Sequence, residues 1–350
     1  ADGVGWLCLW LDCDREGENI CFEVLKVLPE FSADRIWRAS FSAVTELEVH
    51  RALQRLVKPN ACEAAAVDAR QELDLKVGCS FTRLLTRALR DAARRKFGLS
   101  KLRLISYGPC QTPTLFFCVE RQREIDAFVP KQFWELCVTV AVGARDEVEL
   151  KWSRNPCFDG AAARRAADAC RATAALQVQS ATCSRRAAAP PVGMNTVLLL
   201  KLASNALGLS PHRAMEIAES LYTSGFISYP RTETTKYPST FDHQTMVREH
   251  AACRSLPWAP LCEWLLAARA APPTRGGVDA GDHPPITPTR AAPRGAIRGG
   301  TSAWALYCEV CKHYVASLLP PATYDERTLV AAAGGERLEL TWHRVIERGW

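Results

Sequence analysis

Hydrophobic and polar positions along the chain change period in a way that predicts an ordered series of helices and strands. Residues 6–57 show a βαβα pattern, beginning with an apolar strand at 5–11. The next segment places Ile20, Val24 and Val27 at i, i+4 and i+7, which predicts a helix with those side chains on its buried face. A second short strand and a second helix follow. This part of the chain is therefore expected to be a small α/β layer.

The rest of the chain predicts helices, strands and one long loop region. Its 350 residues are 48% hydrophobic and 23% charged, an ordinary globular composition whose length indicates two or three domains. The net charge of +6 slightly favours polyanionic partners, and no apolar run approaches the ~20 residues that cross a bilayer. The expected segments are helical at 61–130, strand-rich around an Ala-rich helix at 131–186, helical at 194–225, loop-rich at 226–300, helical at 302–318, and strand-like to the end.

Fifteen cysteines are scattered along the chain. Their number is odd, and several, such as Cys8, Cys118 and Cys137, lie within apolar patterns. We expect reduced, mostly buried thiols of an intracellular protein. Cys308 and Cys311 form a CxxC pair, but no second pair lies nearby in the sequence, so a zinc site is not expected.

An acidic cluster follows the first apolar strand, in the sequence "DCDREGE". Asp12 and Asp14 point to the same side if the strand continues, and Glu16 and Glu18 follow as the helix begins. Ligands bind at the carboxyl ends of strands in parallel α/β sheets. Clustered carboxylates repel each other, and a hard divalent cation such as Mg²⁺ relieves that repulsion. The alternative is a helix N-terminus whose dipole favours acids, which accounts for one or two of the four.

A second candidate for chemistry is the stretch "LYTSGFISYPRTETT". Tyr222 belongs to the buried face of the preceding helix, a short strand at 226–229 delivers Tyr229, and Pro230 ends that strand. Phenols, with a pKa near ~10, are poor nucleophiles unless a cation stabilises the phenolate or the attacked phosphate. Arg231 is a suitable cation because its planar fork matches phosphate. The alternative is an ordinary strand tyrosine beside a surface arginine.

Both motifs resemble known families. The acidic motif resembles that of the Toprim fold, shared by topoisomerases, bacterial-type primases and some nucleases. The tyrosine motif resembles that of type IA DNA topoisomerases, most closely eukaryotic topoisomerase III and, within it, the beta form. The first resemblance implies that Asp12, Asp14 and Glu16 hold Mg²⁺ and that Arg15 lies near the DNA backbone.

Three further segments resemble the type IA family in the same order: "VDARQELDLKVGCSFTRLLT", "ISYGPCQTPTLFFCVERQREI" and "DAGDHPPITP". "MNTVLLLKLASNALGLSPHRAM" resembles the stretch that leads into the tyrosine domain. The resemblance implies a set of nucleic-acid contacts and a histidine near the active site. These are Arg70, Gln71 and Asp74 on a DNA-contacting helix, Ser106, Tyr107, Gly108, Pro109, Cys110 and Gln111 along the single-strand groove, and His283.

Each of these positions also has a structural explanation. Arg70 and Asp74 have the spacing of an i,i+4 ion pair, and 106–111 of a Gly-Pro turn. His283 is a lone histidine in a Pro-rich loop, where histidines are usually solvated. The Arg-rich stretch at 87–103 is either a phosphate-contacting surface or a solvated helix face.

Aromatic residues near that groove have two interpretations. Tyr107 and Phe117 have apolar neighbours, so core packing is favoured over stacking on a nucleic-acid base.

The resemblance implies a specific reaction. The Tyr229 oxygen attacks a phosphorus of single-stranded DNA, leaving a 5′-phosphotyrosyl link, and the 3′-hydroxyl later reseals the strand. Negative supercoils are relaxed, or circles decatenated, without ATP, and the sequence contains no G-x-x-x-x-G-K-[ST] loop. Arg231 would neutralise the phosphate, Mg²⁺ would assist resealing, and His283 would hydrogen-bond or donate a proton.

Substrate, partners and location follow from the same resemblance. RNA stays open as a second substrate, because the beta branch of the family acts on both nucleic acids. The family implies a RecQ-type helicase or an OB-fold/Tudor scaffold protein as partner, and the nucleus as location, with the cytoplasm as an alternative.

The resemblance also implies a fold class: a partial Toprim α/β domain, then helical domains and a β-rich arm of the type IA toroid. The family's Toprim domain begins with a strand carrying a catalytic glutamate and a nearby lysine, and this sequence has neither. We therefore expect a fragment lacking both ends, whose activity in isolation stays open. The expected boundaries are 1–57 (Toprim), 58–130 (single-strand binding), 131–205 (gate arm), 206–320 (tyrosine domain) and 321–350 (returning arm).

Two other functions remain as alternatives. Another Toprim enzyme, a primase or nuclease, needs the acids but no tyrosine nucleophile. A non-catalytic nucleic-acid-binding protein would show salt-dependent binding without a covalent adduct.

Overall fold

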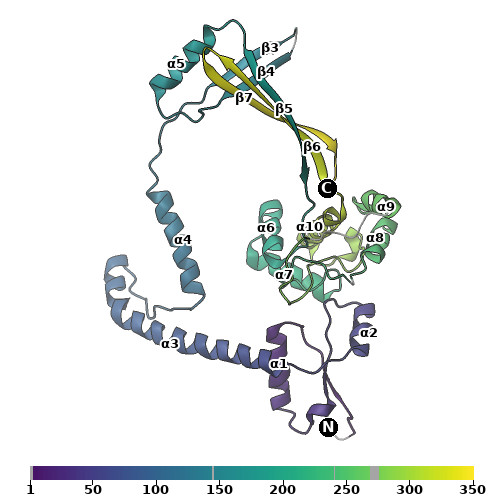
Figure 1. Cartoon of the computed structure of the whole chain (residues 1–350). Coiled ribbons are helices and arrows are strands. Elements are labelled where there is room, and N and C mark those ends of the chain that lie inside the picture. The colour runs from purple at the N-terminus through teal and green to yellow at the C-terminus, as the bar shows by residue number, and fades with distance from the viewer. Residues whose placement is uncertain (1–2, 144–145, 240, 269–275) are drawn as a thin grey trace. The chain divides into compact units, whose positions relative to one another are not determined.

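The computed structural model describes residues 3–143, 146–239, 241–268 and 276–350 (Figure 1). Contacts between Cα atoms divide the chain into two compact units, residues 1–127 with 192–317, and residues 128–191 with 318–350. The finer division at residues 57, 130, 205 and 320 stays a prediction. Part of the expected Pro- and Gly-rich loop, at 269–275, lies outside the described residues.

The first unit is mainly helical, with one short pair of strands. Helices α8 and α9 occur where the sequence predicted mostly loop. The elements are β1 (Leu7–Leu9), α1 (Arg15–Lys26), the 3-10 turn η1 (Ala33–Arg35), β2 (Ile36–Arg38), α2 (Glu46–Gln54), α3 (Ala61–Phe97), α4 (Gln111–Asp126), α6 (Thr196–Leu207), α7 (Pro211–Thr223), α8 (His243–Ala252), α9 (Ala259–Ala267), the 3-10 turn η2 (Arg294–Ala296) and α10 (Gly300–Leu318).

The βαβα pattern expected at the start of the chain is present. Strands β1 and β2 pair in parallel, and Leu9, Cys21 and Ile36 form their small core with the connecting helix α1. The buried face of α1 differs from the expected one. Ile20 is 43% exposed and Val27 is 75% exposed, whereas Cys21 is fully buried. The apolar periodicity was therefore right about the helix and about Val24, which packs against this core, but wrong about Ile20 and Val27.

Helix α3 is the longest helix of the described residues and is bounded by typical caps. The Asn60 side chain accepts hydrogen bonds from the backbone at its start, and Gly98 ends it in the left-handed conformation, with φ of 66°. Along its 37 residues only Ala64 and Val67 are buried. Most of α3 therefore presents its side chains outward, and its first turns pack against α1.

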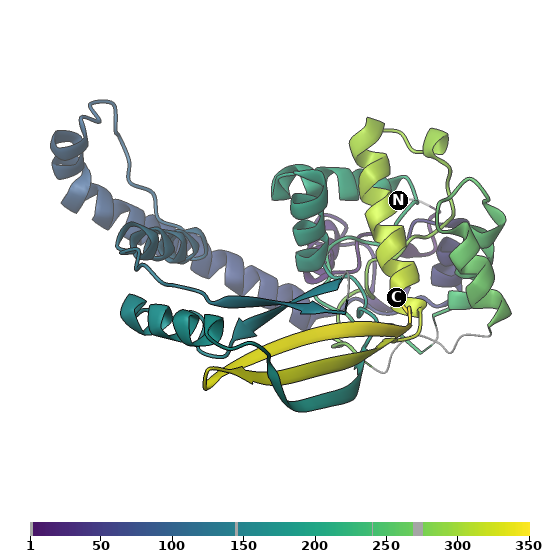
Figure 2. The ribbon, with the colours of Figure 1, turned by 90° about the horizontal axis from the view of Figure 1, so that it is seen from above.

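Helices α6 to α10 lie together and form the larger core of the first unit (Figure 1). In both views α10 lies between α6 on one side and the α8–α9 pair on the other (Figure 2). Its residues Tyr307, Val310 and Cys311 are completely buried. Helix α7 contributes Ala218 and Leu221 to the buried set, as its apolar pattern predicted. This core holds the segment that follows α7, which carries Tyr229.

The second unit is a five-stranded antiparallel sheet with one helix. The strand order is β3-β4-β7-β6-β5, so two separate passes of the chain build one sheet. Leu150 and Trp152 on β4 and Leu338 on β7 form its core with Ala166 of α5. The elements are β3 (Cys137–Val142), β4 (Asp146–Trp152), α5 (Gly160–Arg171), β5 (Gln177–Ala188), β6 (Ala322–Ala333) and β7 (Glu336–Glu347).

The cysteines are all free, but most are not buried. Cys8, Cys118 and Cys137 are exposed, so the expectation of mostly buried thiols was wrong. Cys308 and Cys311 lie on α10.

Two kinds of feature are absent from the described residues. No helix in this part of the chain combines the length and hydropathy of a membrane span. Within the same residues, no group of three or more His, Cys, Asp and Glu side chains is arranged to hold a metal ion.

Candidate active site

The acidic turn between β1 and α1 is shaped by close backbone contacts. The Asp14 side chain caps α1 by accepting a 2.7 Å hydrogen bond from the Gly17 backbone N–H. A Cβ at Gly17 would lie 1.9 Å from the Asp12 carbonyl oxygen, so only glycine fits. The helix-cap explanation is thus correct for Asp14, and Glu16 lies in the first turn of α1, but neither point accounts for Asp12.

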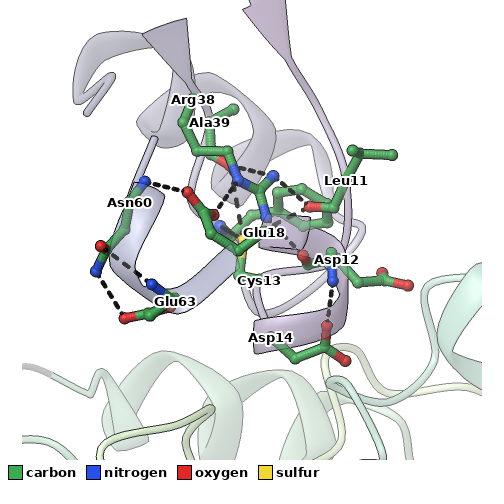
Figure 3. A network of polar contacts seen from close by, with 11 residues as sticks. Leu11, Asp12, Cys13, Asp14, Glu18, Arg38, Ala39, Asn60 and Glu63 are labelled. Carbon is green, nitrogen blue, oxygen red and sulfur yellow. Dashed lines mark hydrogen bonds and ion pairs between the residues drawn. The ribbon is translucent and has the colours of Figure 1, made fainter. Parts of the chain in front are cut away.

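A buried arginine fixes the backbone of this turn. Arg38 leaves the end of β2, and its side chain is 3% exposed. Its guanidinium donates to the carbonyls of Leu11, at 2.7 Å, and Asp12, at 2.6 Å, and forms a 3.0 Å ion pair with Glu18 (Figure 3). The same figure shows the Asp14 side chain pointing away from Arg38. Glu18 therefore helps to hold the backbone of the turn in place, while the Asp14 side chain is available to the site.

The Glu18 side chain also links the acidic turn to the start of α3. Its second carboxylate oxygen accepts the backbone N–H of Asn60. Sequence analysis grouped Glu18 with the acidic cluster and assigned Arg38 no role. No local pattern reveals their pairing, because they lie on different elements.

Tyr229 reaches the acidic turn from the other end of this unit. Its backbone N–H donates to the Ser42 carbonyl at 2.9 Å, and its hydroxyl donates to Asp14 Oδ2 at 2.7 Å, across 215 residues of sequence. The expected strand at 226–229 is reduced to a single bridge between Ile227 and Pro288. Burial, followed by the hydrogen bond to Asp14, raises the pKa of Tyr229 above its ordinary value. The phenol of Tyr229 is therefore neutral near pH 7.

A second tyrosine, which sequence analysis assigned only to the core, contacts the same acids. The Tyr222 hydroxyl donates to Asp12 Oδ1 at 3.0 Å. Its ring meets that of Tyr229 edge to face, with centroids 5.1 Å apart. Two aspartates two residues apart are therefore each bound by one tyrosine. The repeated Tyr spacing of seven residues was visible in the sequence, but its meaning depended on where α7 ends.

Arg231 lies in the same pocket as Tyr229 but is bound to a glutamate. Its guanidinium donates to Glu219 of α7 in an exposed ion pair, with 59% and 43% of the two side chains accessible. The hydrogen bond to Glu219 raises the pKa of Arg231. The arginine is thus charged and near the phenol, as expected, although its partner was not anticipated.

His283 packs directly against the tyrosine. The two ring centroids are 4.5 Å apart, and His283 is 4% exposed. Burial lowers its pKa, against the opposing effect of Asp14, so the ring is neutral near pH 7. Within the described residues, its Nε2 has no hydrogen-bond partner. The alternative of a solvated loop histidine is thus wrong, and the imidazole is buried against the Tyr229 ring, near the site, as the resemblance implied.

The loop that carries His283 is tied to the segment after Tyr229. Asp282 accepts hydrogen bonds from the Thr232 hydroxyl, at 3.0 Å, and the Glu233 backbone N–H, at 2.7 Å. The Thr232 hydroxyl also contacts the carbonyl of His283. These bonds fix the position of the histidine relative to the tyrosine.

Several of these side chains, His283 not among them, line one pocket of about 500 Å³. Asp12, Asp14 and Glu16 face it from the acidic turn, and Tyr229 and Arg231 face it from the opposite wall. Although the three acids share the pocket, they do not form a three-ligand group in the described residues. Carboxylate oxygens suit Mg²⁺, which needs one or two of them and retains several waters. The donor set fits such a cation, and the three-acid set stays a prediction.

The expected nucleic-acid contacts fall into two places. On α3, Arg70 forms a 2.8 Å ion pair with Glu16 of the acidic turn, not with Asp74. Gln71 and Asp74 are exposed on the same helix, and Arg15 is exposed at the start of α1. Arg70 therefore connects α3 to the pocket, and the simple i,i+4 pair is not what forms.

The segment Ser106–Gln111 is held against α3 just before α4. The Tyr107 backbone N–H donates to Thr82 Oγ1 at 2.9 Å, and its ring packs on Phe81 with centroids 5.0 Å apart. Gly108 and Pro109 form the turn that leads through Cys110 to Gln111, the first residue of α4. Tyr107 is therefore half-buried and packs on an aromatic ring that is itself exposed, so it does not belong to a core. Core packing is also wrong for Phe117, which is 71% exposed.

Comparison with known proteins identifies the family. The family model described as DNA topoisomerase matches residues 58–350. The chain belongs to the DNA topoisomerase family. It is similar to DNA topoisomerase 3-beta of Oryza sativa subsp. japonica and of Arabidopsis thaliana, each 44% identical over 353 aligned positions covering 100% of this chain and 40% of the relative.

A solved structure supports the fold of this topoisomerase chain. The structure of full-length topoisomerase I from Thermotoga maritima matches with a TM-score of 0.74 and 24% identity, covering 98% of this chain and 54% of that one. At that identity the likeness shows the fold alone: mixed α/β with an antiparallel sheet. The family model and the relatives together confirm the predicted resemblance to type IA and eukaryotic type III enzymes. The chain spans about 40% of the length of the curated relatives that it matches.

Proposed function

We propose that the whole protein cuts and reseals one strand of single-stranded DNA through a 5′-phosphotyrosyl link on Tyr229. The observation that carries the proposal is the 2.7 Å hydrogen bond from the Tyr229 hydroxyl to Asp14. It joins the two motifs that the family shares, although 215 residues separate them. A core tyrosine would need no acidic pocket and no arginine beside it.

The contacts suggest how the chemistry is divided. The Tyr229 oxygen bonds to a backbone phosphorus while the bond from phosphorus to the 3′ oxygen breaks. The phenol proton passes to Asp14, which already accepts its hydrogen bond, and the departing 3′ oxygen takes a proton from water. Arg231 stabilises the added charge on the phosphate. Resealing reverses each step, and the covalent link conserves the phosphodiester, so ATP is not required.

Magnesium is part of the proposal, with Asp12, Asp14 and Glu16 as the side chains that would hold it. When bound, the cation would offset the phosphate charge and help to align the 3′ end for resealing. The support is their common pocket and the preference of Mg²⁺ for carboxylate oxygens. Asp14 uses one oxygen for Gly17 and the other for Tyr229, so a cation on Asp14 has to share it or displace the hydroxyl.

The proposal also includes the finer domain architecture, the nucleic-acid contacts, the partners and the location that the same resemblance implies. The parallel β1–β2 pair with α1 between them is compatible with part of a Toprim domain, and the two-pass antiparallel sheet with a gate arm. Arg15, Arg70, Gln71, Asp74 and residues 106–111 are the proposed contacts to the strand. RNA as a second substrate, a helicase or scaffold partner, and a nuclear location belong to the proposal on the same grounds.

The decisive experiment removes one oxygen atom. In the whole protein, Tyr229→Phe should abolish the covalent adduct with a single-stranded oligonucleotide on a denaturing gel, while oligonucleotide binding persists. Tyr237→Phe is the matched control, because it removes a buried hydroxyl that hydrogen-bonds with Ser317. Neither Tyr237 nor Ser317 lines the pocket. An adduct that survives Tyr229→Phe would contradict the assignment. Strand cleavage without any wild-type adduct would favour a nuclease.

A further inference from the structure

Tyr222 occupies the last turn of α7 and makes two different contacts in the pocket. Its hydroxyl donates to Asp12 Oδ1, and its ring lies edge to face against the Tyr229 ring, at 68° between the planes. Only 5% of the residue is exposed. A single side chain thus contacts both an acid and the nucleophile.

The end of α7 determines that placement. The helix ends at Thr223, and Gly225 takes φ of 72°, which allows the Phe226 backbone N–H to donate to the Leu221 carbonyl at 2.9 Å. A Cβ at Gly225 would lie 2.7 Å from the Val44 carbonyl oxygen, so the turn accepts no larger residue there without shifting. This tight turn reverses the chain so that Tyr222 and Tyr229 face the same acids.

The Tyr222 hydroxyl does more than find a hydrogen-bond partner, which any buried tyrosine needs. Tyr307 shows the ordinary solution in this chain, because its buried hydroxyl donates to the Arg290 backbone carbonyl at 2.7 Å. Tyr222 instead donates to a carboxylate that lines the pocket, two residues from the acid that binds the nucleophile. The backbone of Asp12 is independently fixed by Arg38. The remaining freedom of the Asp12 carboxylate is its side-chain rotation, which the Tyr222 hydroxyl restricts.

We propose that Tyr222 is a positioning residue of this site: its hydroxyl orients the Asp12 carboxylate while its ring fixes the plane of the Tyr229 phenol. The inference rests on the proposed function and adds a residue to it. It requires that loss of the hydroxyl slow the chemical step without weakening the binding of the strand, since Tyr222 acts through Asp12 and Tyr229.

The test separates the hydroxyl from the ring in the whole protein. Three quantities are measured: the single-turnover rate of adduct formation at saturating oligonucleotide, the oligonucleotide Kd by fluorescence anisotropy, and the thermal midpoint. Tyr222→Phe should lower the rate about tenfold, the usual cost of losing a partner that orients a site carboxylate, with Kd unchanged. Tyr222→Leu, which also removes the ring, should lower it by about 100-fold.

Tyr237→Phe serves as the matched control, because it removes a buried tyrosine hydrogen bond elsewhere in the same unit. It should lower the thermal midpoint as Tyr222→Phe does, without changing the rate. A wild-type rate in Tyr222→Phe would overturn the inference and leave the proposed function standing, as would an equal slowing in Tyr237→Phe or a change confined to Kd. A wild-type protein that forms no adduct would overturn the proposed function, and the inference with it.

Discussion

Two arginine–glutamate pairs lie close to the same site and differ in how far they are buried. Arg38 and Glu18 lie behind the acidic turn, with side chains 3% and 10% exposed. Arg231 and Glu219 lie in the pocket wall, with side chains 59% and 43% exposed. The chemistry of the two pairs is the same, so the difference in function comes from burial.

Burial decides whether such an ion pair holds the surrounding backbone in place or can be exchanged for another partner. Breaking a buried pair leaves one charge without water or partner, which costs about 3–5 kcal/mol. An exposed pair is worth about 0–1 kcal/mol and is screened by salt. Arg38 is therefore suited to holding the acidic turn still, whereas Arg231 can exchange Glu219 for an arriving phosphate.

The largest predicted effect is on the buried pair. Arg38→Met should destabilise the first unit by about 3–5 kcal/mol, because Glu18 is left buried and charged, and the carbonyls of Leu11 and Asp12 lose their donor. The measurement is the thermal midpoint, expected to fall by ~10 °C. Hydrogen exchange of the acidic turn should also become faster.

Two variants control this prediction. Arg51→Met removes the exposed Arg51–Glu48 pair of α2 and should be nearly neutral. The double variant Arg38→Met with Glu18→Leu should recover part of the loss, because no unpaired charge remains. If Arg38→Met is no more harmful than Arg51→Met, the buried pair is not the frame of the turn.

An intermediate effect is predicted for a buried group that has no opposite charge beside it. His250 is 1% exposed, and its Nδ1 accepts a 2.9 Å hydrogen bond from Trp258 Nε1. Burial lowers its pKa to about 4, below the ordinary value near ~6.5 in the unfolded chain. Its contribution to stability is therefore complete above the unfolded pKa and is lost as pH falls toward 4, by on the order of 3 kcal/mol.

The measurement is the thermal midpoint of wild type and His250→Gln between pH 7 and 4. The wild-type midpoint should fall more steeply, because the variant lacks the group that must charge on unfolding. His212→Gln on α7 is the control: its exposed side chain should leave the wild-type slope unchanged. Parallel curves for wild type and His250→Gln would show that burial of this histidine does not affect acid stability.

The smallest predicted effect is on the exposed pair. Glu219→Gln should tighten single-stranded oligonucleotide binding by up to about fivefold at low salt. In the wild type, Arg231 has to give up its ion pair with Glu219 before it can bind a phosphate, and the variant has no such ion pair to break. The gain should vanish in high salt, where the exposed pair is screened. Fluorescence anisotropy across a salt series measures both effects.

A matched glutamate lies one turn away on the same helix. Glu216 pairs with Arg213 and does not line the pocket, so Glu216→Gln should change binding less. In an Arg231→Ala background the effect of Glu219→Gln should disappear, since the arginine for which Glu219 and the phosphate compete is then absent. An equal gain in that background would mean that the effect comes from general charge and not from Arg231.

The sequence allowed the local features of this site to be predicted. The acidic motif follows a strand and opens a helix, as expected. The segment expected to be helical at 61–130 contains α3 and α4, and the tyrosine after α7 was also placed correctly. Such features depend on neighbours within a few residues, and their side-chain chemistry limits them to few conformations.

The chain alone therefore specified most of the helices and strands and the two motifs that name the family, but not α8 and α9. Only folding decided that Tyr222 meets Asp12, that Arg38 lies under the acidic turn, that Glu219 binds Arg231, and that Ile20 faces outward. Each of these depends on which surfaces meet after long loops close. Contacts between distant segments depend on how the whole core packs. The hydrophobic periodicity of one segment therefore does not predict them.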